Sequence, residues 1–364
     1  STQQETLFPY TTLFRSQGVV VDLDAGTATD GWGDTDTLLG IETAEGSEFA
    51  DTITGSDDQN SLRGEGGDDV VDGRAGDDFL KGGEGNDSVA GGEGDDTLFG
   101  GQGNDTLDGG SNTDAFGGDR VYYREDPAGV VVDLSAGTAT DGWGDTDTLI
   151  DIEYVRGSEF EDTMLGGNVD SVVFDGDDGN DSLDGGSATE IDLSGGNGND
   201  TLSGANRSEG GYAFFSPGAG DDVITGSALS FDELSYIFDS RDSDTTNGIT
   251  VTYTSEFDGS VTDYEGGTDT FTDIERIRGT NNDDTFVGAD GNQSFRGFAG
   301  DDTFDGGEGD EDRVDYSRAQ EDLGASQGIV ADLEAGTVTD AYGDTDALIG
   351  IEEIRGSTFG DQIT

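Results

Sequence analysis

The sequence predicts an all-β chain built from tandem solenoid arrays that are joined by β-rich connector segments. Three observations predict this class. A glycine recurs at every ninth position from Gly46 to Gly109, a longer segment recurs several times along the chain, and no segment has a convincing helical period. A fixed period of this kind is typical of repeat architectures, in which each unit contacts only its neighbours.

Each nine-residue unit combines a glycine-rich turn with one acid or amide and one apolar residue. In the unit that starts at Gly82, the acid is Asp87 and the apolar residue is Val89. Glycine permits a sharp turn with exposed carbonyl groups, and the apolar residue begins a short strand. One apolar side chain per unit cannot form a core alone, so the units must stack. The residues expected to point inward are Ile53, Leu62, Val71, Leu80, Val89, Leu98, Leu107 and Phe116.

The units at residues 82–90 and 100–108 fit the pattern G-G-x-G-x-D-x-U-x, in which U is apolar. This pattern resembles the calcium-binding nonapeptide of RTX (hemolysin-type) proteins, which form parallel β-rolls. Calcium prefers carboxylate and backbone carbonyl oxygens, and a glycine-rich turn that ends in Asp supplies both. The resemblance implies that two nonapeptides complete one coil. It also implies that acids eighteen residues apart share an ion, as Asp69 would with Asp87.

The resemblance places candidate calcium ligands in three arrays. In the first, Asp51 and Asp114 belong to units that depart from the full glycine pattern, and Asn60 is neutral, so we expect weaker sites there. In the second, acids follow one another at steps of nineteen residues, and in the third Gln293 replaces one acid, so we expect fewer ions in both. The predicted metal ligands are Asp51, Asp69, Asp78, Asp87, Asp96, Asp105, Asp114, Asp162, Asp181, Asp200, Asp222, Asp284 and Asp302.

The chain is strongly acidic, with a formal net charge of −68 from 83 acids and 15 bases. Phosphate binding needs a basic surface, so nucleic acid is excluded as a partner. No apolar run has the length of a transmembrane helix. Acids on adjacent coils would repel one another without a counter-ion. We therefore expect the arrays to fold as calcium binds.

The sequence contains no cysteine and no histidine. This excludes disulfides, zinc sites of the Cys/His type and histidine-based catalytic triads. No acid stands outside the repeat pattern as a dedicated general acid or base would, so we expect no catalytic site in this chain. The absence of disulfides fits a secreted protein that uses calcium to staple its fold.

A longer repeat forms the connectors that precede the arrays. Residues 18–23 recur as 129–134, residues 26–38 recur unchanged as 137–149, a third copy begins at Gly328, and a divergent copy spans residues 248–279. The alternation of Val19, Val21 and Leu23 predicts a strand. The expected modules are 17–117 and 118–230, each a connector followed by an array, 231–310 with the divergent connector, and 311–364, a truncated fourth module.

The two ends of the sequence do not follow the repeat. Residues 6–16 are the translation of a common short-read sequencing adapter, so we expect residues 1–16 to be an artefact and exclude them from the fold. The sequence stops part-way into a unit at Thr364. We expect the chain to be an internal fragment of a longer protein.

One connector loop has the recurring pattern D-x-[W/Y]-G-D-T-D, with Trp32, Trp143 and Tyr342 at the aromatic position. These aromatic residues could be platforms for sugar stacking or could pack on their own module. The acids beside them could form an additional calcium site or a solvated turn. These acids are Asp34 and Asp36, Asp145 and Asp147, and Asp344 and Asp346.

The function that the sequence predicts is that of a non-enzymatic, calcium-binding segment of a secreted or cell-surface protein. It would be a monomeric stalk, spacer or adhesin region, since near-identical tandem modules suit a stalk that lengthens by duplication. The RTX resemblance implies bacterial type I export of the unfolded chain. Two alternatives stay open. The chain could be the accessory RTX region of a secreted protease, lipase or polysaccharide-modifying enzyme, or a disordered acidic mineral-binding chain. The sequence does not identify a cell-surface or glycan partner.

Overall fold

The computed structural model describes residues 17–112, 118–205, 210–237, 247–317 and 325–364. These residues form strands and turns, and no helix occurs among them. The predicted all-β class is therefore confirmed. The chain divides into two compact units, Ser1–Asp177 and Asp178–Thr364.

In the first unit, the strands belong to two sheets. The strands of the first sheet are β1 (Val20–Asp22), β2 (Thr27–Thr29), β3 (Thr35–Thr37), β5 (Thr52–Thr54), β7 (Val70–Ala75), β9 (Ser88–Glu93), β11 (Thr106–Ser111), β13 (Val131–Asp133), β14 (Thr138–Thr140), β15 (Thr146–Ile150) and β17 (Thr163–Leu165). The strands of the second sheet are β4 (Thr43–Ser47), β6 (Ser61–Gly66), β8 (Phe79–Glu84), β10 (Thr97–Gln102), β12 (Arg120–Tyr122), β16 (Tyr154–Arg156) and β18 (Ser171–Asp178).

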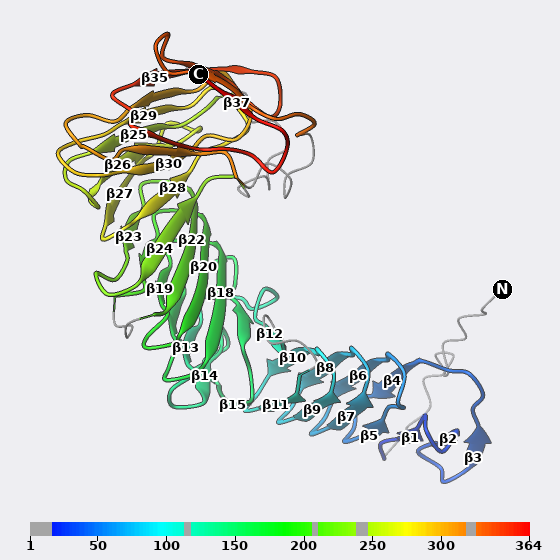
Figure 1. Cartoon of the computed structure of the whole chain (residues 1–364). Coiled ribbons are helices and arrows are strands. Elements are labelled where there is room, and N and C mark those ends of the chain that lie inside the picture. The colour runs from blue at the N-terminus through cyan, green and yellow to red at the C-terminus, as the bar shows by residue number, and fades with distance from the viewer. Residues whose placement is uncertain (1–16, 113–117, 206–209, 238–246, 318–324) are drawn as a thin grey trace. The chain divides into compact units, whose positions relative to one another are not determined.

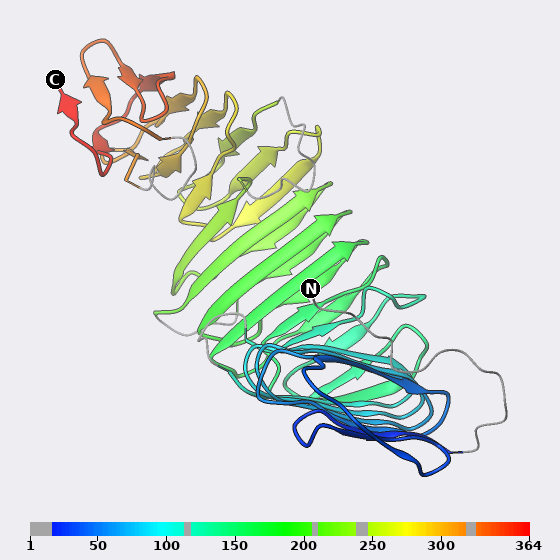
Figure 2. The ribbon, with the colours of Figure 1, turned by 90° about the vertical axis from the view of Figure 1, so that its right-hand side faces the viewer.

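The nine-residue repeats of this unit form a solenoid in which successive strands alternate between the two sheets (Figure 1). Neighbouring strands within a sheet are parallel, and Leu62 pairs with Leu80 as Val71 pairs with Val89. Two nonapeptides therefore complete one coil, as the resemblance implied. Figure 2 looks along this array, and its successive coils superimpose.

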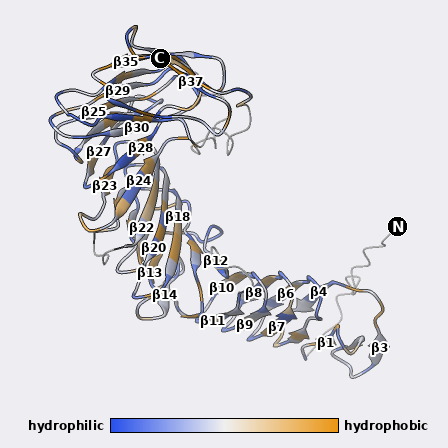
Figure 3. Ribbon diagram, in the orientation of Figure 1, coloured by the Kyte–Doolittle hydropathy of each residue, from blue (hydrophilic) through white to orange (hydrophobic). Residues whose placement is uncertain are grey.

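The core of the first array is a narrow stack of the apolar residues that the period identified. Ile53, Leu62, Val71, Leu80 and Val89 are 0% exposed, and so are the two that follow, Leu98 and Leu107. Phe116 lies outside the described residues. The alternation of apolar strand positions with polar turns can be followed along the ribbon in Figure 3. Since each coil contributes only two such side chains, the core exists only while the coils are stacked.

Each connector is an antiparallel three-stranded segment that is inserted into the first sheet. β13 pairs with β14, and β14 pairs with β15, both antiparallel. β15 then lies parallel to β11 of the preceding array, while β13 lies parallel to β17. In the second sheet, β12 and β16 continue the parallel ladder from β10. The connector therefore stacks on the end of the array as a further coil.

The second unit has the same plan. Its first sheet contains β19 (Ser182–Asp184), β21 (Thr201–Ser203), β23 (Val223–Thr225), β25 (Thr250–Tyr253), β26 (Gly259–Thr262), β27 (Thr268–Thr272), β29 (Thr285–Val287), β31 (Thr303–Asp305), β33 (Val330–Asp332), β34 (Thr337–Thr339), β35 (Thr345–Ile349) and β37 (Gln362–Ile363). Its second sheet contains β20 (Glu190–Asn197), β22 (Tyr212–Ala219), β24 (Phe231–Ser235), β28 (Arg276–Arg278), β30 (Ser294–Arg296), β32 (Arg313–Asp315) and β36 (Glu353–Arg355).

The connectors of this unit are the antiparallel sets β25–β27 and β33–β35. The core of its last array is aromatic. Phe286, Phe295 and Phe304 are 0% exposed, and the rings of Phe286 and Phe304 stack with their centroids 5.1 Å apart. Within the part of the chain that the structure describes, no helix has the length and apolar character of a membrane span.

Candidate metal centre

The acids that end the turns of the first array are buried. Asp69, Asp78, Asp87, Asp96 and Asp105 are each at most 3% exposed. Their Oδ1 atoms bind the backbone of the preceding coil: the N–H of Asp69 donates to Asp87 over 2.8 Å, and the N–H of Asp87 donates to Asp105 over 2.8 Å. On the other side of the solenoid, the N–H of Asp78 donates to Asp96 over 2.7 Å. The structure thus brings together the pairs that the eighteen-residue spacing joined.

The second carboxylate oxygen, Oδ2, of each of these five acids accepts no hydrogen bond from a described group. In the turn of Asp69, this oxygen lies over Gly64, beside the carbonyl oxygen of Gly82 from the next coil. A Cβ added to Gly64 would come closer than 3.0 Å to both oxygens, so only glycine leaves this space open. The same two groups, Oδ2 of the acid in the turn and a carbonyl oxygen of the next coil, lie close to three more glycines, Gly73, Gly82 and Gly91.

Further backbone carbonyl groups are packed between successive turns. Gly83 and Gly85 have φ values of 131° and 136°. A Cβ on Gly83 would come closer than 3.0 Å to the carbonyl oxygen of Glu65, and one on Gly85 would do so to that of Gly67. Both the backbone conformation and the close approach therefore require glycine. Carbonyl oxygens thus accompany the buried carboxylates of Asp69, Asp78, Asp87 and Asp96, and this is the donor set that calcium prefers.

No three acidic side chains of the described residues come together as a metal-binding group. An ion in the array would therefore take one or two carboxylates and complete its shell with backbone carbonyl oxygens. Calcium accepts six to eight oxygen ligands in flexible geometry and fits such a set. The donor chemistry of the array is compatible with calcium.

Burial makes the charged form of these acids unfavourable in the absence of a cation. Desolvation by burial raises the pKa of Asp69, Asp78 and Asp105 to about 7. The same cause raises the pKa of Asp87 and Asp96 to about 6. A cation held at the free oxygen would favour the charged form and remove this penalty.

The first acids of the arrays have a different environment, because protein groups bind both of their oxygens. Asp162 accepts from the N–H of Val130 at Oδ1 over 2.7 Å and from the N–H of Ser158 at Oδ2 over 2.7 Å. The hydroxyl of Ser158 also donates to Oδ1 over 2.9 Å. Asp284 has the same three contacts with Ile249 and Thr280, and Asp51 has them with Val19 and Ser47.

The remaining predicted ligands continue the pattern in the second unit. The N–H of Asp181 donates to Asp200 over 2.8 Å, and that of Asp200 donates to Asp222 over 2.7 Å. The N–H of Asp284 donates to Asp302 over 2.9 Å. Oδ2 of Asp200 and of Asp302 accepts no hydrogen bond from a described group. Asp114 lies outside the described residues.

Two acids that the nine-residue spacing did not identify extend the rows of the first array into the connector. The N–H of Asp96 donates to Asp119 over 2.8 Å, 23 residues further on, and the N–H of Asp105 donates to Asp147 over 3.0 Å, 42 residues further on. The recurring D-T-D sequence was the available signal for Asp147. In the second unit the corresponding acids are Asp269, Asp312 and Asp346.

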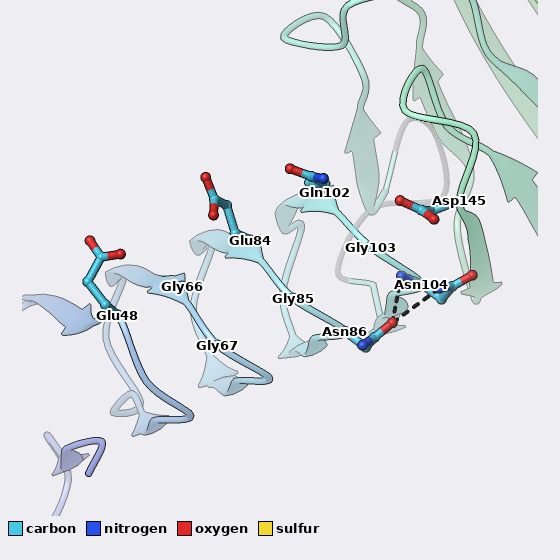
Figure 4. A pocket seen from close by; sticks show the side chains of 10 residues that line it. All are labelled: Glu48, Gly66, Gly67, Glu84, Gly85, Asn86, Gln102, Gly103, Asn104 and Asp145. Carbon is cyan, nitrogen blue, oxygen red and sulfur yellow. Dashed lines mark hydrogen bonds between the residues drawn. The ribbon is translucent and has the colours of Figure 1, made fainter. Parts of the chain in front are cut away.

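The solvent side of the turns carries a separate polar ladder. The backbone N–H and the side-chain amide of Asn104 each donate to Oδ1 of Asn86 over 3.1 Å. Glu48, Glu84 and Gln102 project from turns on the same side of the solenoid, with Gly66 on the turn between Glu48 and Glu84 (Figure 4). These three side chains, together with Asn86 and Asn104, line an open groove of about 410 Å³. The ladder ties adjacent coils together on their outer side.

Four segments of the chain match the family model of the RTX calcium-binding nonapeptide repeat, at residues 45–80, 81–115, 192–206 and 278–310. The predicted RTX resemblance is therefore confirmed for the arrays, whose parallel two-sheet coils agree with a β-roll. A comparison with curated proteins gave no match.

Proposed function

We propose that the chain binds calcium along its buried rows of acids and folds as it binds, because four of its segments match the family model of the RTX calcium-binding nonapeptide repeat. The observation that carries this proposal is the Oδ2 atom of the interior acids, which is buried, lacks a hydrogen-bond donor and lies beside a backbone carbonyl oxygen. The proposed ligands with both features are Asp69, Asp78, Asp87, Asp96 and Asp200, and we propose Asp105 and Asp302 with them because their Oδ2 atoms are likewise buried without a donor.

The energetic reason is that an unpaired buried carboxylate strongly disfavours the folded state. The first array repeats this unfavourable group at Asp69, Asp78, Asp87, Asp96 and Asp105, within a chain of formal net charge −68. A divalent cation between two coils neutralises the carboxylates and supplies bonds that hold the coils together. Binding free energy then becomes folding free energy. We expect dissociation constants of about 10⁻⁴–10⁻³ M, as in other extracellular calcium modules.

As its biological role, the chain would be a calcium-stiffened stalk, spacer or adhesin region of a secreted or cell-surface protein. Support comes from the near-identical modules, since residues 26–38 and 137–149 are the same sequence. Duplication of such a module lengthens a stalk without new chemistry. A chain that folds only in calcium would stay unfolded in a low-calcium cytoplasm and could pass through a type I exporter. RTX repeats are generally structural, and we propose a non-catalytic role for these arrays.

The test is a calcium titration of the full chain at constant ionic strength, followed by far-UV circular dichroism and by the number of bound ions. Asp87→Asn removes one charge and the free oxygen, while the amide oxygen can still accept the N–H of Asp69. The matched control is Asp77→Asn, which removes one exposed charge and can still accept the N–H of Asp95. We expect only Asp87→Asn to lower the ion count and to raise the calcium midpoint. Equal behaviour of the two variants would contradict the proposal.

A further inference from the structure

The row of acids in the first sheet of the first unit ends differently from its interior. Asp147 resembles the interior acids at Oδ1, which accepts the N–H of Asp105 over 3.0 Å. At Oδ2, however, it accepts the hydroxyl of Tyr123 over 3.1 Å. Both side chains are buried, with Asp147 0% and Tyr123 3% exposed. The oxygen that is free in the interior acids is thus occupied by a tyrosine hydroxyl in the last one.

The same arrangement recurs in the other two described connectors that follow an array. The hydroxyl of Tyr236 donates to Oδ2 of Asp269 over 2.6 Å, and that of Tyr316 donates to Oδ2 of Asp346 over 2.6 Å. Each of these acids also accepts the N–H of the preceding acid at Oδ1. Tyr236 lies in the module 231–310, whose connector sequence differs most from the others. The contact is therefore a repeated feature of the described connectors that follow an array.

The beginning of each first-sheet row is also closed by protein donors. The first acids Asp51, Asp162 and Asp284 accept from a Ser or Thr four residues earlier and from a connector strand. On the opposite sheet, Asn60 takes this first position, and its Oδ1 accepts the N–H of Ser56 over 2.6 Å. A neutral amide at this position needs no cation to balance its charge.

We propose that, in the first sheet, the connectors close both ends of each calcium row with protein donors in place of an ion. Tyr123, Tyr236 and Tyr316 would close the ends, and the Ser or Thr of each first turn would close the beginnings. This inference rests on the proposed calcium function and adds to it which acids take no ion. A cation at Asp147 would have to displace the Tyr123 hydroxyl from a buried site. The connectors would therefore stay packed on the array without binding calcium at these positions.

The test compares two isosteric variants of the full chain after equilibrium dialysis against calcium, with the bound ions counted by elemental analysis. Asp147→Asn keeps an oxygen for the N–H of Asp105 but changes the group that faces Tyr123. We expect this variant to bind as many ions as the unaltered chain, with the same calcium midpoint. Asp87→Asn is expected to bind fewer. A reduced count in Asp147→Asn would overturn the inference, whereas an unreduced count in Asp87→Asn would overturn the calcium function itself.

A second variant decides the matter if Asp147→Asn fails to fold. Tyr123→Phe removes only the hydroxyl and leaves Oδ2 of Asp147 free, as it is in the interior acids. We expect this variant to be less stable than the unaltered chain in calcium, and to bind no fewer ions. A loss of bound ions in Tyr123→Phe would show that the tyrosine supports an ion at this position, and would overturn the inference.

Discussion

Replacement of Asp87 by Ala should be among the most damaging changes in the first array. Asp87 lies between the coils of Asp69 and Asp105 and would contribute to the ions on both sides. Its loss leaves the buried N–H of Asp69 without an acceptor, which costs about 1–3 kcal/mol. An ion present at ten times its dissociation constant contributes about 1.4 kcal/mol. With two ions lost, we expect the free energy of unfolding to fall by about 4–6 kcal/mol.

The assay is urea unfolding of the full chain at fixed calcium, combined with a count of bound ions. Asp51→Ala is the comparison, because Val19 and Ser47 already bind both oxygens of Asp51. We expect this variant to lose hydrogen bonds but no ion. Equal ion counts and equal unfolding midpoints for the two variants would refute the shared-ligand arrangement.

Three further outcomes follow from the same geometry. Gly83→Ala forces a Cβ closer than 3.0 Å to the carbonyl oxygen of Glu65, at a residue whose φ is 131°. The control is Gly144→Ala, because Gly144 has a φ of 92° and open space around it. The urea midpoint of Gly83→Ala should fall well below that of Gly144→Ala. Burial raises the pKa of Asp69 from 3.8 to about 7. Protonation of Asp69 therefore stabilises the calcium-free fold fully below about pH 4, and this stabilisation is lost as the pH rises to 7. Circular dichroism in chelator should show more β structure at about pH 4 than at about pH 8. In calcium the pH dependence of stability reverses, because protons compete with calcium for the carboxylates. The calcium concentration at the midpoint of folding should therefore rise as the pH falls below about 7. Magnesium should substitute poorly in the same titration, because it demands a smaller octahedral shell and loses its water reluctantly.

The sequence was sufficient to predict the arrays because their physical constraints are local. A turn that needs glycine, an inward acid and one apolar residue leaves a mark at every ninth position, as at Gly82, Asp87 and Val89. Stacking then follows, because Val89 alone cannot form a core. The pairing of Val71 with Val89 and of Leu62 with Leu80 followed from this period together with the RTX resemblance, which implied two units per coil.

The ends of the rows could not be predicted from the period, because the residues that meet there are far apart and unequally spaced. The N–H of Asp105 donates to Asp147, although an antiparallel segment is inserted between them in the sequence. The hydroxyl of Tyr123, from a different segment of the chain, donates to the same carboxylate. The spacing also placed Asp51 and Asp162 among the candidate ligands. It could not reveal that serine side chains and connector strands bind their oxygens. Those donors appear only when the connector is stacked on the array.

The most direct test of calcium binding by the interior acids is anomalous diffraction from crystals of this chain grown in calcium. We predict anomalous peaks about 2.3–2.6 Å from Oδ2 of Asp69, Asp87 and Asp105, with carbonyl oxygens of adjacent coils in the same shell, and no peak at Asp147. A folded array whose interior carboxylates have no peak at millimolar calcium would contradict the account.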